Sequence, residues 1–589
     1  MKKRNTILTA LLIAATSSIA SPVMPGHKKT ITLADGTSLV AEQHGDEFMS
    51  WWEAADGRRY VPADGDGSMY VEADMDAMLS GAKEARRHIS MRQADIANRI
   101  DNAFNRRNDA MLRGIGDRIT YTGKKKGLIV LVQFTDKKFE PGHDRDYYEA
   151  VANQPGLTSD EGYVGSVRDY FLAQSNGQFE LTFDVVGPVT MKHGYAYYGA
   201  NVVGKTDYRV GEMISEASDA AAPQVNLADY DWDGDGTADQ VFFLYAGLNE
   251  AASDDPSTIW PHMYYMRYRS GVLTYDSGRI DTYACASELN AKRDSSTGKY
   301  TKETRPSGIG AICHEFSHCL GFPDMYDTNG QRLYGMGYYD PLSVGCYLGN
   351  SFVPCNFTAW ERTFAGWVDP IEIDRAATVK AMHSAADYGR PLIMHSDSNA
   401  DEYYLFENRQ KSGWDAKLYG KGLMITHVDY DKDRWSKNIV NAYGQDHQRC
   451  TIFHADNNDS MNSPADISGD LYPYSPKDGS AANNSLTDSS TPAATLWNSH
   501  DASLGTSYMG KPVTDITLNA DGTIAMSFMG GNRSNIIDNS TETGISAPTT
   551  SARRPTDKRV FAIDGRMVAT STANLPSGIY IVGGKKIVR

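Results

Sequence analysis

The chain has 589 residues, which is too long for one hydrophobic core, so several domains are expected. It carries 58 Lys and Arg against 74 Asp and Glu, a formal net charge of −16, which argues against nucleic acid or an anionic membrane surface as the main partner. Aromatic residues are plentiful (34 Tyr, 9 Trp and 18 Phe), as in folded rather than disordered proteins. No apolar stretch of about 18 residues follows the N-terminal region, so no transmembrane segment is predicted.

Residues 1–20 have the layout of a secretory signal peptide. A positive stretch, Met1–Arg4, precedes an apolar run over 7–15 and small residues at 18–20. The apolar run is too short for a membrane anchor, so we expect cleavage after about Ala20. The protein is therefore predicted to be secreted or held at the cell surface after export through the periplasm.

Residues 21–115 form an N-terminal region of their own. Residues 30–36 and 45–52 alternate apolar and polar side chains like strands broken by turns. Residues 74–113 are instead rich in Ala, Arg and Asp with helical spacing.

The next region, residues 116–370, mixes strands and helices. The continuous apolar run at 128–134 predicts a central strand. A helical segment is expected at 167–173 and a further strand at 179–186. We therefore predict a mixed α/β domain here.

Four aspartates match positions 1, 3, 5 and 9 of a calcium-binding loop: Asp231, Asp233, Asp235 and Asp239. Gly236 stands at the tight-turn position 6 of that loop. Position 12, where such loops carry a bidentate Glu, holds Phe242, so this is not a helix–loop–helix hand. The pattern favours a Ca²⁺ site closed in another way over an acidic turn before a strand.

The most informative motif is His314-Glu315-Phe316-Ser317-His318. On a helix, His314 and His318 leave the same face one turn apart, so two imidazole nitrogens can share one Zn²⁺. Glu315 projects from the adjacent side, where it can take a proton from an activated water. The alternative without a metal site is an amphipathic helix with two histidines on its surface.

The residues after this motif strengthen the metal interpretation. Gly321 can take the positive φ that ends a helix, and Pro323 prevents the helix from resuming. Asp324 is then a candidate third ligand, although the fold can supply another carboxylate instead. Three protein ligands and an open fourth position are what a catalytic zinc site requires.

The motif predicts a zinc endopeptidase that acts on protein substrates, with Glu315 as the catalytic base. A secreted protease must stay silent until export, so we interpret 21–115 as an inhibitory propeptide of a zymogen rather than an accessory domain. The lysines at 124–126 are either a processing point or linker charge. Three tyrosines are unranked candidates for stabilising the oxyanion: Tyr338, Tyr339 and Tyr347. The rival function is a secreted adhesin or binding protein with a degenerate protease fold, which the intact motif disfavours.

After residue 370 the sequence has the pattern of β-strands. We predict a β-rich, sandwich-type domain over 371–530, in which Glu407 and the pair His427 and Asp429 either bind a second ion or, as we favour, are satisfied structural groups. Residues 531–558 are rich in Ser, Thr, Asn and Gly, as flexible linkers are. Residues 559–589 are expected to form a small β module.

Six cysteines allow up to three bridges or several buried thiols, and the sequence does not fix their connectivity: Cys285, Cys313, Cys319, Cys346, Cys355 and Cys450. Cys313 and Cys319 are about 9 Å apart along one helix and cannot pair with each other.

Taken together, these motifs resemble the immune-inhibitor-A-type secreted zinc metallopeptidases. The resemblance rests on the blocks Gly45–Phe48, Tyr230–Asp239, Ile259–His262, His314–Asp327 and Gly422–Asp429. It implies a metzincin-like catalytic domain, broad endopeptidase activity, synthesis as a zymogen, and metal and base roles for His314, His318 and Glu315. The family usually has a methionine beneath the metal; here Leu342 stands at that place, with Met336 as the alternative.

The C-terminal tail resembles the sorting modules of Bacteroidetes secreted proteins. That resemblance implies recognition by an outer-membrane export machine, with the linker providing reach. The alternative is a β module without a sorting role.

Overall fold

The computed structural model describes residues 19–540 except 64–66, 87–120, 202–205, 254, 295, 331–334, 443, 445, 462, 480 and 499–506, and four short strands after residue 559. Residues 1–540 form one compact unit and 541–589 a second. Three predicted segments lie wholly or partly outside the described residues: the signal peptide up to residue 18, residues 87–113 of the helical stretch, and residues 541–558 of the linker.

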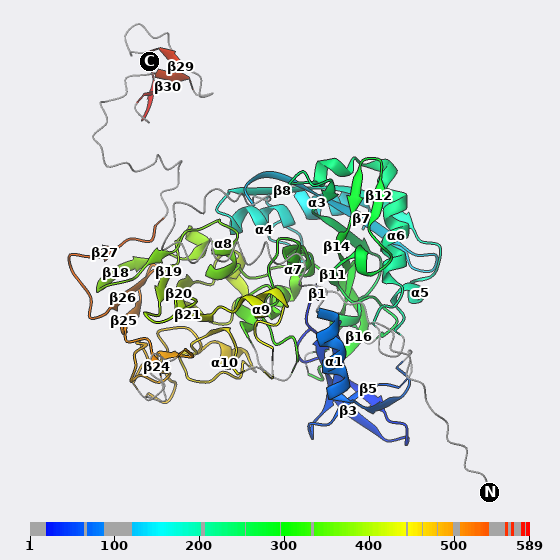
Figure 1. The fold of residues 1–589 in the computed structure, drawn as a ribbon, viewed down its shortest axis with the longest axis horizontal. Coiled ribbons are helices and arrows are strands. Elements are labelled where there is room, and N and C mark those ends of the chain that lie inside the picture. The colour runs from blue at the N-terminus through cyan, green and yellow to red at the C-terminus, as the bar shows by residue number, and fades with distance from the viewer. Residues whose placement is uncertain are drawn as a thin grey trace. The chain divides into compact units, whose positions relative to one another are not determined.

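A six-stranded sheet forms the centre of the first unit (Figure 1). Its strands, in spatial order, are β1 (Ile19–Ala20), β11 (His262–Tyr265), β14 (Thr282–Ser287), β10 (Val241–Tyr245), β7 (Gly123–Gln133) and β8 (Phe179–Thr190). The last four run parallel, whereas β11 is antiparallel to β14 and β1 is antiparallel to β11. The apolar run predicted as a central strand lies in β7, where residues 128–132 are buried because the sheet is covered on both faces.

The lysines at 124–126 are not linker charge. They lie in the first half of β7 and pair with Glu180–Thr182 of β8. The Lys126 ammonium lies 3.0 Å from a carboxylate oxygen of Asp184, and Lys124 faces Glu180. Strand pairing therefore continues beyond the apolar run because acidic residues on β8 offset the lysine charges.

Helices lie along the sheet, and one of them, α7, carries the His314–His318 motif. Their bounds are α3 Arg145–Asn153, α4 Val167–Gln174, α5 Tyr195–Gly199, α6 Val210–Ala221, α7 Gly310–Cys319 and α8 Ala359–Phe364. α4 begins with a capping box between Ser166 and Asp169. Phe316 of α7 packs against Phe171 of α4 and Phe183 of β8, which fixes the motif helix to the core.

The N-terminal region is a five-stranded antiparallel sheet followed by a helix (Figure 1). The strands are β2 (Lys28–Thr32), β3 (Ser38–Asp46), β4 (Met49–Ala54), β5 (Arg59–Pro62) and β6 (Tyr70–Glu72), and the helix is α1 (Met75–Arg86). Ile31, Trp52, Tyr60 and Tyr70 share a small core. The alternation at 30–36 and 45–52 thus correctly predicted strands.

The described part of the β-rich region has a two-stranded sheet, β23 (Thr495–Leu496) with β24 (Ser507–Tyr508), and two larger sheets. One has the order β17 (Ile371–Glu372), β19 (Leu392–His395), β20 (Glu402–Arg409), β21 (Gly422–Asp429) and β22 (Cys450–Ile452). The other has the order β25 (Val513–Leu518), β26 (Ile524–Phe528), β18 (Ala377–Met382) and β27 (Ile536–Ile537).

The first of the two larger sheets is buried on both faces. Tyr404 and Phe406 of β20 share a core with the second sheet, whereas Tyr403 and Leu405 join the core that contains α7. Because successive side chains of a strand point to opposite faces, β20 contributes residues to both hydrophobic cores. This arrangement fixes the loops of the β-rich region against the motif helix.

In the second unit, the described backbone forms a four-stranded antiparallel sheet in the order β29-β28-β30-β31. The strands are β28 (Val560–Ala562), β29 (Met567–Ala569), β30 (Ile579–Val582) and β31 (Lys585–Val588). The predicted tail segment thus contains the expected β structure.

A fully buried arginine ties β20 to the loops around α7. The Arg409 guanidinium contacts both Asp415 carboxylate oxygens at 2.7 and 2.8 Å and donates to the carbonyl oxygens of Tyr339 and Asn356. Both charged side chains are excluded from water, so each needs the opposite charge of the other to offset the cost of its burial.

We expect Arg409→Met to destabilise the folded chain by about 3–5 kcal/mol, because it leaves the Asp415 carboxylate buried without its cation. The measurement is the calorimetric unfolding midpoint, which should fall by several degrees. Arg375→Met, at an exposed arginine, is the matched control and should change stability by less than about 0.5 kcal/mol. Equal midpoints for the two variants would contradict this role of Arg409.

Candidate metal centre and active site

The two histidines of α7 present paired ring nitrogens. The Nε2 atoms of His314 and His318 lie 3.1 Å apart. The Nδ1 atoms lie 2.7 Å from the carbonyl oxygens of Pro341 and Phe322. Because a carbonyl oxygen only accepts, both Nδ1 atoms carry the proton, which leaves the Nε2 lone pairs free to bind a metal.

Asp324 joins this pair after the helix ends. Its Oδ1 lies 3.4 Å from each Nε2 atom. Among the described residues, this buried oxygen has no hydrogen-bond partner. Ligands at about 2.0–2.1 Å from a tetrahedral Zn²⁺ are separated by about 3.3 Å, so the three atoms have the spacing of a zinc site. Burial opposes ionisation, but the facing imidazoles of His318 and His314 outweigh it and hold the pKa of Asp324 well below its ordinary value.

Glu315 lies beside the three candidate ligands. One of its carboxylate oxygens lies within 4.8 Å of a ring nitrogen of each histidine. The side chain is fully buried, and burial raises the pKa of Glu315 to about 8, against the opposing effect of His314. Oε2 has no hydrogen-bond partner within the described part of the chain. A carboxylate with one unoccupied oxygen beside paired metal ligands is suited to accept a proton.

Glycines allow the close packing that the centre needs. A Cβ atom added at Gly310, the first residue of α7, would lie 2.0 Å from the Cys346 carbonyl oxygen. Gly321 has φ +91°, as predicted, and its N–H donates to the His318 carbonyl oxygen as the helix ends. The turn then brings Phe322 and Asp324 back to the histidines.

The N-terminal segment reaches the same site from the other side. The Ser21 backbone N–H and hydroxyl donate to Glu315 Oε1 at 2.6 and 2.7 Å. Ile19 and Ala20 pair with Met263 and His262 of β11 just before this contact. The carbonyl oxygens of Ser21 and Pro22 accept from Trp260 Nε1 and the Tyr347 hydroxyl. Sequence reasoning did not single out Ser21, because nothing in its local pattern marks it.

The structure separates the three candidate tyrosines. The Tyr339 hydroxyl is directed to the Ile467 carbonyl oxygen, and the Tyr338 ring packs on Tyr419. Tyr347 contacts the segment that covers Glu315. It is therefore the candidate that lies at the site.

Three of the four aspartates of the predicted calcium loop lie close together in the structure. Carboxylate oxygens of Asp231, Asp233 and Asp239 lie within 4.8 Å of one another. Asp235 is not in this group, and its Oδ1 accepts from the Thr237 N–H at 2.7 Å. Phe242 is buried in β10, so this strand supplies no carboxylate at the closing position. Calcium binding here stays a prediction.

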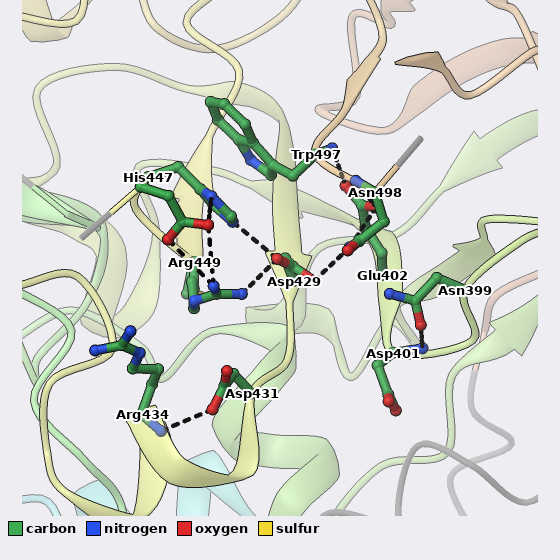
Figure 2. Close-up of polar contacts among 12 residues, drawn as sticks. Asn399, Asp401, Glu402, Asp429, Asp431, Arg434, His447, Arg449, Trp497 and Asn498 are labelled. Atoms are coloured by element: carbon green, nitrogen blue, oxygen red, sulfur yellow. Dashed lines mark hydrogen bonds and ion pairs between the residues drawn. The ribbon is translucent and has the colours of Figure 1, made fainter. Parts of the chain in front are cut away.

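The polar groups of β20 and β21 have protein partners. Figure 2 shows Asp429 accepting from His447, Arg449 and Asn498. His427 contacts Glu402, whose oxygens also accept from Trp497 and Asn498. Glu407 accepts from the Ala359 N–H at the start of α8. These contacts favour the structural alternative over a second ion.

Two further observations bear on the sequence predictions. All six cysteines are buried. In the part of the chain that the structure describes, no helix is both long and apolar enough to cross a bilayer.

The segment that contains this site is similar to a known peptidase domain. Residues 120–367 match the family model of the immune inhibitor A peptidase M6 catalytic domain. The matched segment contains all four residues of the candidate centre, and the match supports a metallopeptidase hydrolase.

Two relatives agree with this match. The chain is 29% identical to the pre-pro-metalloprotease PrtV of Vibrio cholerae over 282 residues, which cover 41% of this chain and 29% of PrtV. It is 23% identical to immune inhibitor A of Bacillus thuringiensis subsp. alesti over 299 residues, which cover 43% of this chain and 42% of that protein. The chain thus spans less than half the length of these relatives.

Proposed function

We propose that this protein is a secreted zinc endopeptidase, made as a zymogen, that hydrolyses peptide bonds of extracellular proteins. The observation that carries the proposal is the convergence of His314, His318 and Asp324 on one point, with Glu315 beside them. The match to a peptidase catalytic domain supports the same reaction class.

The mechanism follows from the placement of these side chains. When bound, Zn²⁺ polarises the scissile carbonyl and lowers the pKa of water. Glu315, once uncovered, accepts the proton of the attacking water and transfers it to the leaving amine. The Tyr347 hydroxyl already donates to a peptide carbonyl oxygen, so it is suited to hydrogen-bond the oxygen that becomes negative.

Contacts of the N-terminal segment support the zymogen part of the proposal. Ser21 occupies Oε1 of Glu315, and the Ser21 carbonyl oxygen accepts from Trp260 Nε1, so this segment lies against the proposed base. The buried Glu315 cannot accept a proton from water while this segment is in place. These contacts support the interpretation of 21–115 as an inhibitory propeptide.

Glu315→Gln should lower the turnover of casein or a fluorogenic peptide by the processed enzyme by at least about 100-fold, the range that general-base catalysis contributes. Bound zinc should remain at one equivalent, because Glu315 is not a ligand. Turnover and metal content are measured on the same preparations.

Glu303→Gln, on the exposed strand β16 (Tyr300–Pro306), is the matched control and should retain full activity. Tyr347→Phe, in the same assay, should lower turnover with zinc unchanged. If the processed wild type binds zinc but cuts neither substrate, proteolysis is excluded and the binding-protein alternative takes its place.

Ser21→Ala should increase the basal activity of the uncut precursor by about 2–10-fold. It removes the hydroxyl bond to Glu315, and an ordinary intramolecular hydrogen bond contributes about 0.5–1.5 kcal/mol. Peptide hydrolysis is followed on precursor shown by mass spectrometry to be intact. Ser38→Ala, at an exposed serine of β3, should behave as wild type. Equal basal rates for both variants would refute the role of Ser21.

Calcium in the aspartate loop is the remaining metal prediction. Ca²⁺ at about 100 times its dissociation constant should stabilise the wild type by about 2.7 kcal/mol. Asp231→Asn should lose this gain, whereas Asp229→Asn, at an exposed neighbour, should keep it. Calorimetric unfolding with and without Ca²⁺ measures both. If the unfolding midpoint of the wild type does not respond to Ca²⁺, the loop is an acidic turn and not a calcium site.

Export of the protein and use of the C-terminal module by an outer-membrane export machine stay predictions from the sequence.

A further inference from the structure

Asn438 links the β-rich region to Asp324. Its Oδ1 accepts from the Asp324 N–H at 2.6 Å, and its Nδ2 donates to Asp324 Oδ2 at 2.5 Å. Asn438 is only 1% exposed. One asparagine side chain therefore holds both the backbone and one carboxylate oxygen of Asp324, which leaves Oδ1 facing the two histidines.

The chain holds Asn438 in place from its N-terminal side. It follows the short helix α9 (Lys432–Ser436), whose first residues donate to the Asp431 carboxylate (Figure 2). Asn438 has φ +53°, a left-handed conformation that asparagine tolerates better than most residues. Its carbonyl oxygen accepts from the Thr328 hydroxyl, so the loop after Asp324 also contacts it.

The residues that follow fix the same loop. Asn441 donates to the carbonyl oxygens of Met325 and Cys450. Arg449 is paired with the buried Asp429 of β21 (Figure 2). The loop that carries Asn438 is therefore anchored at both ends to the β-rich region.

A carboxylate ligand needs such a partner for two reasons. Asp324 Oδ2 is buried, and an unsatisfied buried oxygen is costly. A carboxylate with two equivalent oxygens can also rotate away from the position in which one oxygen faces the metal. Partners of metal ligands commonly fix this orientation, and their loss weakens metal binding about 10–100-fold.

We propose that Asn438 is a positioning residue of the zinc centre, which orients Asp324 so that a single oxygen faces the metal. The candidate ligands lie within residues 120–367, whereas Asn438 lies outside this segment. The β-rich region is then part of the metal centre rather than an appendage. This inference rests on the zinc ligand set proposed above.

The test is the zinc affinity of the full-length protein, measured by competition with a chromogenic chelator at 25 °C. Asn438→Gly removes the side chain but keeps the left-handed backbone free of strain. Asn438→Asp keeps the shape and replaces the donor by an acceptor. Both should bind zinc about 10–100-fold more weakly than the wild type. Unfolding of each apoprotein is recorded alongside.

Asn539→Ala is the matched control, because Asn539 is also buried and contacts only backbone groups, those of His383 and Arg390 in the β-rich region. It should lower apoprotein stability while zinc affinity stays within about threefold of the wild type. Wild-type affinity in both Asn438 variants, or an equal loss in Asn539→Ala, would overturn the proposal. If Asp324→Ala bound zinc as tightly as the wild type, the ligand set itself would be wrong.

Discussion

Ionisable groups that water cannot reach must find their partners within the protein, and the centre around α7 depends on this constraint. His314, Glu315 and Asp324 are fully buried, and His318 is 3% exposed. Each histidine donates its Nδ1 proton to a carbonyl, and Asp324 shares its oxygens between the histidines and Asn438. Each ring and carboxylate orientation is therefore set by a neighbour, as a preorganised metal site requires.

The sheet that is buried on both faces gives these partners their rigidity. β20 and β21 contribute alternate side chains to two cores, so neither strand can shift without disturbing both. The side chain of Arg409, on β20, donates to the Tyr339 and Asn356 carbonyl oxygens in the loops near α7. The loop after β21 contains Asn438, which contacts Asp324. Stability and metal geometry thus depend on the same elements.

The local part of the site could be predicted from the sequence because it obeys helix geometry. The spacing of His314 and His318 fixes their common face, and the positive φ of Gly321 ends the helix so that Asp324 returns to them. The apolar run of β7 was likewise sufficient to predict a central strand.

The distant contacts could not be predicted. Ser21 lies 294 positions from Glu315, and Asn438 lies 114 positions from Asp324. No short-range period connects such residues, and serine or asparagine is too common to mark a site. The strand pairing of Lys124–Lys126 was missed for a related reason, since the compensating charges come from β8.

The two-residue strand β1 also protects the central sheet. It covers the outer side of β11, so in the precursor this strand has a neighbour on each side. β1 lies at the end of the predicted signal peptide, so once that peptide is cleaved the N–H and C=O groups of β11 that it had paired become an open sheet edge, which any extended chain can join. The same edge that would recruit unfolded polypeptides also invites self-association. Covering this edge until the signal peptide is removed therefore guards the chain against aggregation before export is complete.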